Sequence, residues 1–132
     1  MGEAVAGMYH VGIIASDYEQ AVWFYHNMLG LTIYKESYSE KRKARKLQMY
    51  CGKSYVIELF VPEHCESCRV ESGYMRTCVN HISFLVSDVG AMLDRMKRNH
   101  IETEGVNLDM ETGKRYGFCY GPDGVKIELY ER

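Results

Sequence analysis

The sequence has little net charge and no long apolar run. Its 132 residues include 16 Lys and Arg and 18 Asp and Glu, which gives a formal net charge of −2 at pH 7. Because both signs are spread along the chain, its charge favours neither nucleic acid nor an anionic membrane as a partner. The apolar runs fall far short of the roughly 20 residues of a membrane-spanning helix, and residues 1–6 fit neither a secretory nor a myristoylation signal. We therefore expect a soluble, cytoplasmic protein without nucleic-acid or membrane partners.

Cysteine occurs in an odd number, five, and without a secretory signal. We therefore expect reduced thiols and not a disulfide framework. The alternative is a structural zinc site, because Cys65-x-x-Cys68 is followed by Cys78 and by His81 at Cys-x-x-His spacing. That site would remove His81 from the repeated pattern described next, so reduced loop thiols are the simpler interpretation.

Two short segments each occur twice. Residues 10–17, His-Val-Gly-Ile-Ile-Ala-Ser-Asp, return at 81–88 as His-Ile-Ser-Phe-Leu-Val-Ser-Asp, an offset of 71 (81 − 10). Residues 57–60, Ile-Glu-Leu-Phe, return at 127–130 as Ile-Glu-Leu-Tyr, an offset of 70 (127 − 57). The first segment has the alternation of a strand and ends in a helix-capping Ser-Asp pair. The chain therefore reads as two similar halves.

Each half is predicted to have the order β-α-β-β-β. In the first half Ser16 is the expected helix cap, Glu19 completes a capping box, and the helix continues through Met28. In the second half Ser87 or Asp88 caps the helix. The strands of the two halves are expected at residues 9–15, 31–37, 46–51 and 55–61, and at 79–86, 101–106, 115–120 and 125–130. The predicted modules are 8–61 and 79–132, with 62–78 as a linker loop, in one domain covering 8–132.

Strand alternation predicts where the polar residues of the repeated segments point. The apolar alternate positions of the first and last strands suit packing on the helix, so the open face carries a His and a Glu in each half. These residues are His10, Glu58, His81 and Glu128. The His-to-Glu separation is 48 residues (58 − 10) in the first half and 47 (128 − 81) in the second. Two imidazoles and two carboxylates suit Zn²⁺, Ni²⁺, Co²⁺, Mn²⁺ or Fe²⁺ and leave two positions of an octahedral ion open.

One charged run, residues 40–46, has two interpretations. A run such as Glu-Lys-Arg-Lys-Ala-Arg-Lys is typical of a solvated hairpin tip. The alternative is a role in gripping an anionic substrate.

Five segments of the chain form a set that is typical of one known family, namely residues 9–18, 24–31, 55–60, 80–84 and 121–131. They resemble the vicinal oxygen chelate superfamily, which includes glyoxalases, bleomycin resistance proteins and dioxygenases. The resemblance implies an α+β fold in which two βαβββ modules form an open, metal-centred mixed β-barrel. Within the superfamily the chain is similar to small bacterial glyoxalase I-like proteins, that is, lactoylglutathione lyase-like proteins.

The resemblance implies a specific site and reaction. The His, Glu, His, Glu ligand order of glyoxalase I falls on His10, Glu58, His81 and Glu128, which would hold one divalent ion, Ni, Co or Zn, with Mn and Fe as alternatives. The implied reaction converts the thiol hemithioacetal of a 2-oxoaldehyde such as methylglyoxal to a 2-hydroxyacyl thioester through an enediolate, a detoxification reaction. Glu128 would be the catalytic base, with Glu58 as its symmetry-related counterpart.

The same resemblance implies partners for the protein and leaves alternative functions open. A small-molecule substrate, a thiol cosubstrate such as glutathione and a second copy in a homodimer are the expected partners. Lys114 and Arg115 are candidates for contacting an anionic group. A metal-dependent dioxygenase and a non-enzymatic small-molecule-binding protein of the same superfamily are the alternatives; Glu58 favours glyoxalase I, because related dioxygenases use two His and one carboxylate.

Overall fold

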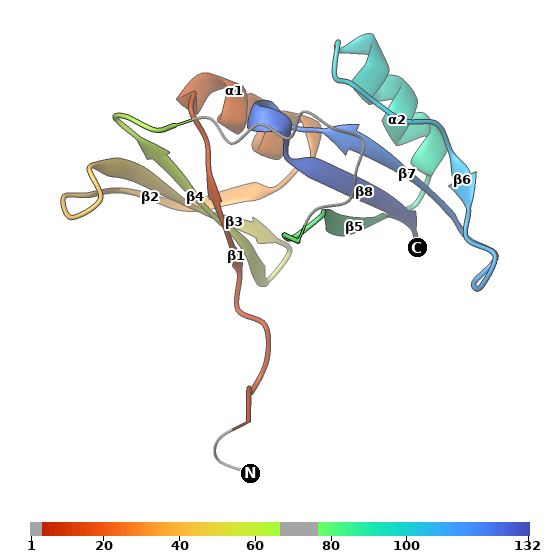
Figure 1. The fold of residues 1–132 in the computed structure, drawn as a ribbon, viewed down its shortest axis with the longest axis horizontal. Coiled ribbons are helices and arrows are strands. Elements are labelled where there is room, and N and C mark those ends of the chain that lie inside the picture. The colour runs from red at the N-terminus through yellow and green to blue at the C-terminus, as the bar shows by residue number, and fades with distance from the viewer. Residues whose placement is uncertain (1–3, 67–76) are drawn as a thin grey trace. The chain divides into compact units, whose positions relative to one another are not determined.

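The structure is a computed structural model that describes residues 4–66 and 77–132. Its chain divides into two compact units, residues 1–67 and 68–132. Each unit contains one four-stranded mixed sheet and one helical segment that precedes three of its strands (Figure 1). This confirms the predicted α+β fold class.

The first unit has its strands in the order β1-β4-β3-β2. The edge strand β1 runs parallel to β4, and the remaining pairs are antiparallel. The helical segment carries the chain from β1 to β2 at the other edge of the sheet, and β3 and β4 then return antiparallel, so the first and last strands of the repeat are neighbours. The elements are β1 (Val11–Ile14), α1 (Tyr18–Val22), the π-helical turn η1 (Trp23–Met28), β2 (Thr32–Ser39), β3 (Ala44–Cys51) and β4 (Ser54–Pro62).

The helix of the first unit departs from the sequence prediction in two respects. Its N-cap is Asp17, not Ser16, because the Asp17 carboxylate accepts a 2.9 Å hydrogen bond from the Gln20 backbone N–H. After Val22 the predicted single α-helix widens into η1, in which the Leu29 N–H donates to the Phe24 carbonyl, five residues back. The element ends at Gly30, whose φ of 79° suits a residue without Cβ.

The second unit repeats the arrangement, with strand order β5-β8-β7-β6 and β5 parallel to β8. Asp88 caps its helix, one of the two predicted caps, and accepts from the Ala91 N–H at 2.9 Å. The elements are β5 (Ile82–Val86), α2 (Val89–Arg98), β6 (Asn107–Leu108), β7 (Arg115–Tyr120), the 3₁₀ turn η2 (Pro122–Gly124) and β8 (Lys126–Glu131).

The predicted strand at 101–106 is wrong. Only an isolated bridge between Thr103 and Cys119 forms there, and the true strand β6 is the two-residue pair that follows. The chain passes close to β7 at this point, where a Cβ on Gly117 would meet the Gly105 carbonyl oxygen at 3.4 Å. Local β-propensity did not reveal that only one residue pair would bridge here.

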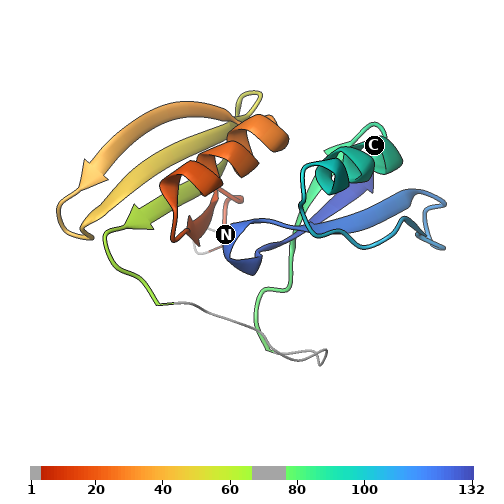
Figure 2. The same ribbon diagram turned by 90° about the horizontal axis from the view of Figure 1, so that it is seen from above.

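Each helix covers one face of its own sheet (Figure 2). The covered faces hold the core, including Leu47, Ile57 and Leu59 in the first unit and Ile127 and Leu129 in the second, all fully buried. On the opposite faces, Ile14 is 63% exposed and Leu85 is 69% exposed. The predicted alternation of core-facing and open-facing positions is therefore confirmed. No helix in the described ranges is long and apolar enough to cross a membrane.

Candidate metal centre

In the first unit the parallel pairing of β1 and β4 brings His10 beside Glu58. His10 directly precedes β1, and Glu58 lies opposite Gly12 in the β1–β4 register. The His10 Nε2 atom is 3.6 Å from the Glu58 Oε1 atom. Both side chains are mostly buried, at 22% and 19% exposure. A carboxylate this enclosed needs compensating partners.

Glu58 has two such partners, and both act on its second oxygen. The Tyr55 hydroxyl donates to Oε2 at 3.3 Å, and the Lys46 ammonium lies 3.4 Å from the same atom. Burial, and then the negative charge of Glu58, raise the pKa of Tyr55 to about 12, so its hydroxyl keeps its proton at neutral pH. Oε1 is thus the oxygen that faces His10.

The imidazole of His10 lies between two phenol rings. Its ring centroid is 4.6 Å from that of Tyr55 and 4.7 Å from that of Tyr9. Its Nδ1 atom is buried without a hydrogen-bond partner among the described residues. A buried polar atom without a partner is uncommon and marks a place where a ligand or water is expected.

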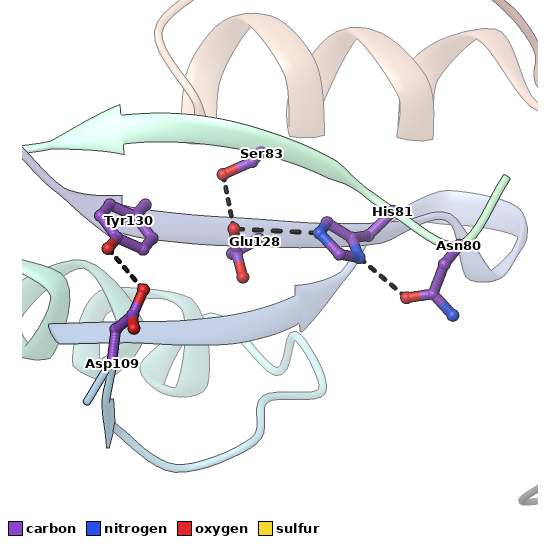
Figure 3. Close-up of polar contacts among 6 residues, drawn as sticks. All are labelled: Asn80, His81, Ser83, Asp109, Glu128 and Tyr130. Carbon is purple, nitrogen blue, oxygen red and sulfur yellow. Dashed lines mark hydrogen bonds and ion pairs between the residues drawn. The ribbon is translucent and has the colours of Figure 1, made fainter. Parts of the chain in front are cut away.

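The second unit contains the equivalent pair (Figure 3). His81 precedes β5, Glu128 lies opposite Ser83 in the β5–β8 register, and the His81 Nε2 atom is 3.8 Å from Glu128 Oε1. The Ser83 hydroxyl donates to Glu128 Oε1 at 2.7 Å. His81 Nδ1 lies 2.8 Å from the Asn80 amide oxygen, to which it donates when it carries the ring proton. That tautomer leaves a lone pair on Nε2, toward Glu128.

The two pairs differ in how the carboxylate is held. The strand position opposite the Glu is Gly12 in the first unit and Ser83 in the second. Gly12 has no side chain to donate, and there Glu58 is held from β3 and β4, by Lys46 and Tyr55. Glu128 instead accepts from a neutral donor, the Ser83 hydroxyl. The first unit therefore places a positive charge at its carboxylate.

The donor atoms fit a divalent transition metal. Neutral imidazole nitrogen and carboxylate oxygen are common ligands of Zn²⁺, Ni²⁺ and Co²⁺. Two ligands at about 2.1 Å from one ion lie about 3–4 Å apart, and the two His–Glu separations of 3.6 and 3.8 Å fall in that range. Within the described residues no group of three or more His, Cys, Asp or Glu gathers at one point, so each unit presents a two-residue donor set.

The other sequence candidates lie elsewhere or outside the described residues. Arg115 begins β7 and Lys114 directly precedes it, and both are exposed. Their backbone N–H groups donate to Glu131 and Thr112, respectively. Cys65 and Cys78 are exposed free thiols. Cys68, the remaining cysteine of the alternative zinc site, lies outside the described residues.

Sequence reasoning missed the residues that hold the two carboxylates and His81. They are Lys46, Tyr55, Asn80 and Ser83. Tyr55 was hidden by a register shift between Met49 and Tyr50, which places Tyr50 opposite Tyr55. Asn80 and Ser83 could have been found from the sequence, because they lie one residue before and two residues after the repeated His81.

A comparison with protein families gives a match over most of the chain. Residues 7–129 match the Glyoxalase/Bleomycin resistance protein/Dioxygenase superfamily. The chain belongs to this superfamily. The superfamily includes enzymes, and its members commonly bind a divalent metal and small molecules.

Related proteins and a solved structure align with most of this chain and over most of their own length. A Bacillus subtilis (strain 168) protein, "Uncharacterized protein YwkD", is 38% identical over 95% of this chain and 96% of its own. The lactoylglutathione lyase of Salmonella typhimurium is 28% identical over 92% of this chain and 90% of its own. The crystal structure of SMU.1112c matches with a TM-score of 0.81 and 31% identity, over 97% of this chain and 100% of its own.

The fold alone does not select an activity. The fosfomycin resistance protein FosX of Listeria monocytogenes has the same fold, with a TM-score of 0.69 and 18% identity over 98% of this chain and 95% of its own. The choice of reaction therefore depends on the side chains at the site.

Proposed function

We propose that this protein is a metal-dependent lyase of the glyoxalase I type, which converts the hemithioacetal of a 2-oxoaldehyde such as methylglyoxal and a thiol to a 2-hydroxyacyl thioester. The observation that carries the proposal is the repeated His–Glu pair, at 3.6 Å in one unit and 3.8 Å in the other, at equivalent strand positions. The 28% identity with a lactoylglutathione lyase over most of both chains supports the same reaction. Glutathione is the first thiol to test, and a homodimer is the expected assembly.

In this proposal His10, Glu58, His81 and Glu128 hold one divalent ion. When bound, the ion supplies Lewis acidity, which stabilises negative charge that develops on adjacent substrate oxygens. Asn80 fixes the His81 ring so that Nε2 carries the lone pair. Nickel, cobalt and zinc are the first candidates for these ligands.

Glu128 is the proposed base. The Ser83 hydroxyl holds one of its oxygens, Oε1, at 2.7 Å, which fixes the carboxylate group while Oε2 takes the proton from the substrate carbon. Glu58 is held more firmly, because a phenol and an ammonium both contact its Oε2 atom. Glu58 is therefore the more constrained carboxylate and serves the opposite face of the substrate.

Metal analysis combined with an activity screen tests the proposal. The purified protein is expected to contain about one divalent ion per chain and to turn over methylglyoxal with at least one of glutathione and several smaller thiols. Strict dependence on O₂ and Fe²⁺ would favour a dioxygenase, and metal binding without turnover by any thiol would favour a binding protein. His64→Ala, which removes an exposed histidine that belongs to neither pair, is the matched control for His10→Ala.

A further inference from the structure

The two histidines of the proposed metal site differ in what their Nδ1 atoms contact. His81 Nδ1 lies 2.8 Å from the Asn80 amide oxygen, on the side of the ring away from Glu128 (Figure 3). His10 Nδ1 is buried and has no hydrogen-bond partner among the described residues. The residue that precedes His10 is Tyr9, which has no amide oxygen. Within the described part of the chain, His81 therefore has an acceptor for an Nδ1 proton and His10 has none.

The aromatic rings around His10 do not replace that acceptor. The Tyr9 ring packs on the imidazole with 4.7 Å between centroids, and the Tyr55 ring packs on it at 4.6 Å. The Tyr55 hydroxyl donates to Glu58 Oε2 at 3.3 Å. These contacts restrict the orientation of the His10 ring, but the choice of tautomer depends on a polar contact at a ring nitrogen.

The contacts of the two rings favour different tautomers. A neutral imidazole carries one ring proton, and the hydrogen bonds of its two nitrogens decide which of them keeps it. In His81 the Asn80 oxygen lies 2.8 Å from Nδ1, whereas Glu128 Oε1 is 3.8 Å from Nε2. In His10, whose Nδ1 has no partner in the described residues, Glu58 Oε1 lies 3.6 Å from Nε2. His81 therefore has a lone pair at Nε2, and His10 has its proton there.

We infer that the two imidazoles are unequal metal ligands, with His81 as the anchoring histidine, Asn80 as its positioning residue and His10 as the weaker ligand. The inference rests on the proposed function, because it takes both Nε2 atoms to bind one ion. A metal binds the lone pair of a neutral imidazole nitrogen, and His81 already has that lone pair at Nε2. In His10 the proton must first move from Nε2 to Nδ1, where it would be a buried N–H without an acceptor, an unfavourable state.

Ring-nitrogen NMR of the metal-free full chain, at a pH at which imidazoles are neutral, tests the tautomers without zinc or turnover. We expect the Nδ1–H form for His81 and the Nε2–H form for His10. Asn80 is exposed, so Asn80→Leu should fold and should shift His81 toward the Nε2–H form. Asn80→Asp keeps an acceptor oxygen and should retain the Nδ1–H form. The same tautomer in both wild-type rings, or an unchanged His81 ring in Asn80→Leu, would overturn the inference.

Calorimetric titration with zinc measures the consequence for metal binding. Asn80→Leu should raise the dissociation constant by about 10-fold or more, the effect of losing a partner behind a ligating histidine, and His81→Ala should raise it more than His10→Ala. Asn107→Leu is the matched control, because it replaces another exposed asparagine of the second unit, whose amide donates to the Gly105 carbonyl oxygen. Equal losses in His10→Ala and His81→Ala would overturn the inference. Zinc binding without turnover contradicts only the proposed reaction, and a wild type that binds no zinc contradicts both.

Discussion

Replacing Glu128 with Gln separates its role as a base from its role in the structure. The Gln side chain has the same shape, and its amide oxygen can still accept the 2.7 Å hydrogen bond from Ser83. It can also still offer that oxygen to a metal, so the fold and part of the metal affinity should persist. An amide nitrogen in place of Oε2 cannot take a proton from carbon at neutral pH. A positioned general base contributes about 10²–10⁴-fold, so turnover should fall by roughly 100-fold or more.

The assay is anaerobic turnover of a methylglyoxal–thiol hemithioacetal in D₂O by the wild type and by Glu128→Gln. We expect the wild type to form the thioester with deuterium from solvent, and the variant to form almost none. Glu111→Gln, which removes an exposed carboxylate from a loop of the same unit, should behave as the wild type. Turnover that needs O₂, or a Glu128→Gln variant with wild-type rate, would refute the assignment.

Three further predictions concern stability and the cysteines. Gly117→Ala should lower the free energy of unfolding by about 1–3 kcal/mol in chemical denaturation, because the new Cβ would lie 2.5 Å from Leu93 Cδ1 in the core. Asp88→Ala should cost about 1 kcal/mol through loss of the helix cap, whereas Asp88→Asn should cost less; equal losses would show that capping is not the cause. A variant with Cys65, Cys68 and Cys78 all replaced by Ser should keep its metal content. Loss of one metal equivalent per chain would instead support the zinc site in the linker.

The sequence predicted the two-part α+β fold because its signal is repeated and periodic. The offsets of 71 and 70 residues reappear as equivalent registers, with Val11 opposite Ile57 in one unit and Ile82 opposite Ile127 in the other. Period-2 alternation also identified the core face correctly, since Ile57 and Leu59 are fully buried. Structural features that produce a pattern over whole strands can therefore be predicted from the sequence.

Features that depend on a single residue pair could not be predicted from the sequence. Alternation placed Tyr55 on the same face as Ile57, yet the register shift beside Tyr50 lets its hydroxyl reach Glu58. Lys46 was assigned both to the charged run 40–46 and to the start of the strand 46–51, because a charge run carries no information on where a turn ends. Its alternation with the buried Leu47 would have placed it on the open face, beside Glu58. The cap at Asp17 and the π-helical turn likewise depend on single hydrogen bonds.

Metal titration of the wild type and of four single variants tests the central claim most directly. The variants are His10→Ala, Glu58→Ala, His81→Ala and Glu128→Ala, with His64→Ala as the control. The account predicts one divalent ion per wild-type chain and a dissociation constant at least about 10-fold higher in each of the four, since losing even a group that only supports a ligand costs about 10–100-fold. The control should match the wild type. Unchanged affinity in any of the four variants would contradict a site that uses both His–Glu pairs.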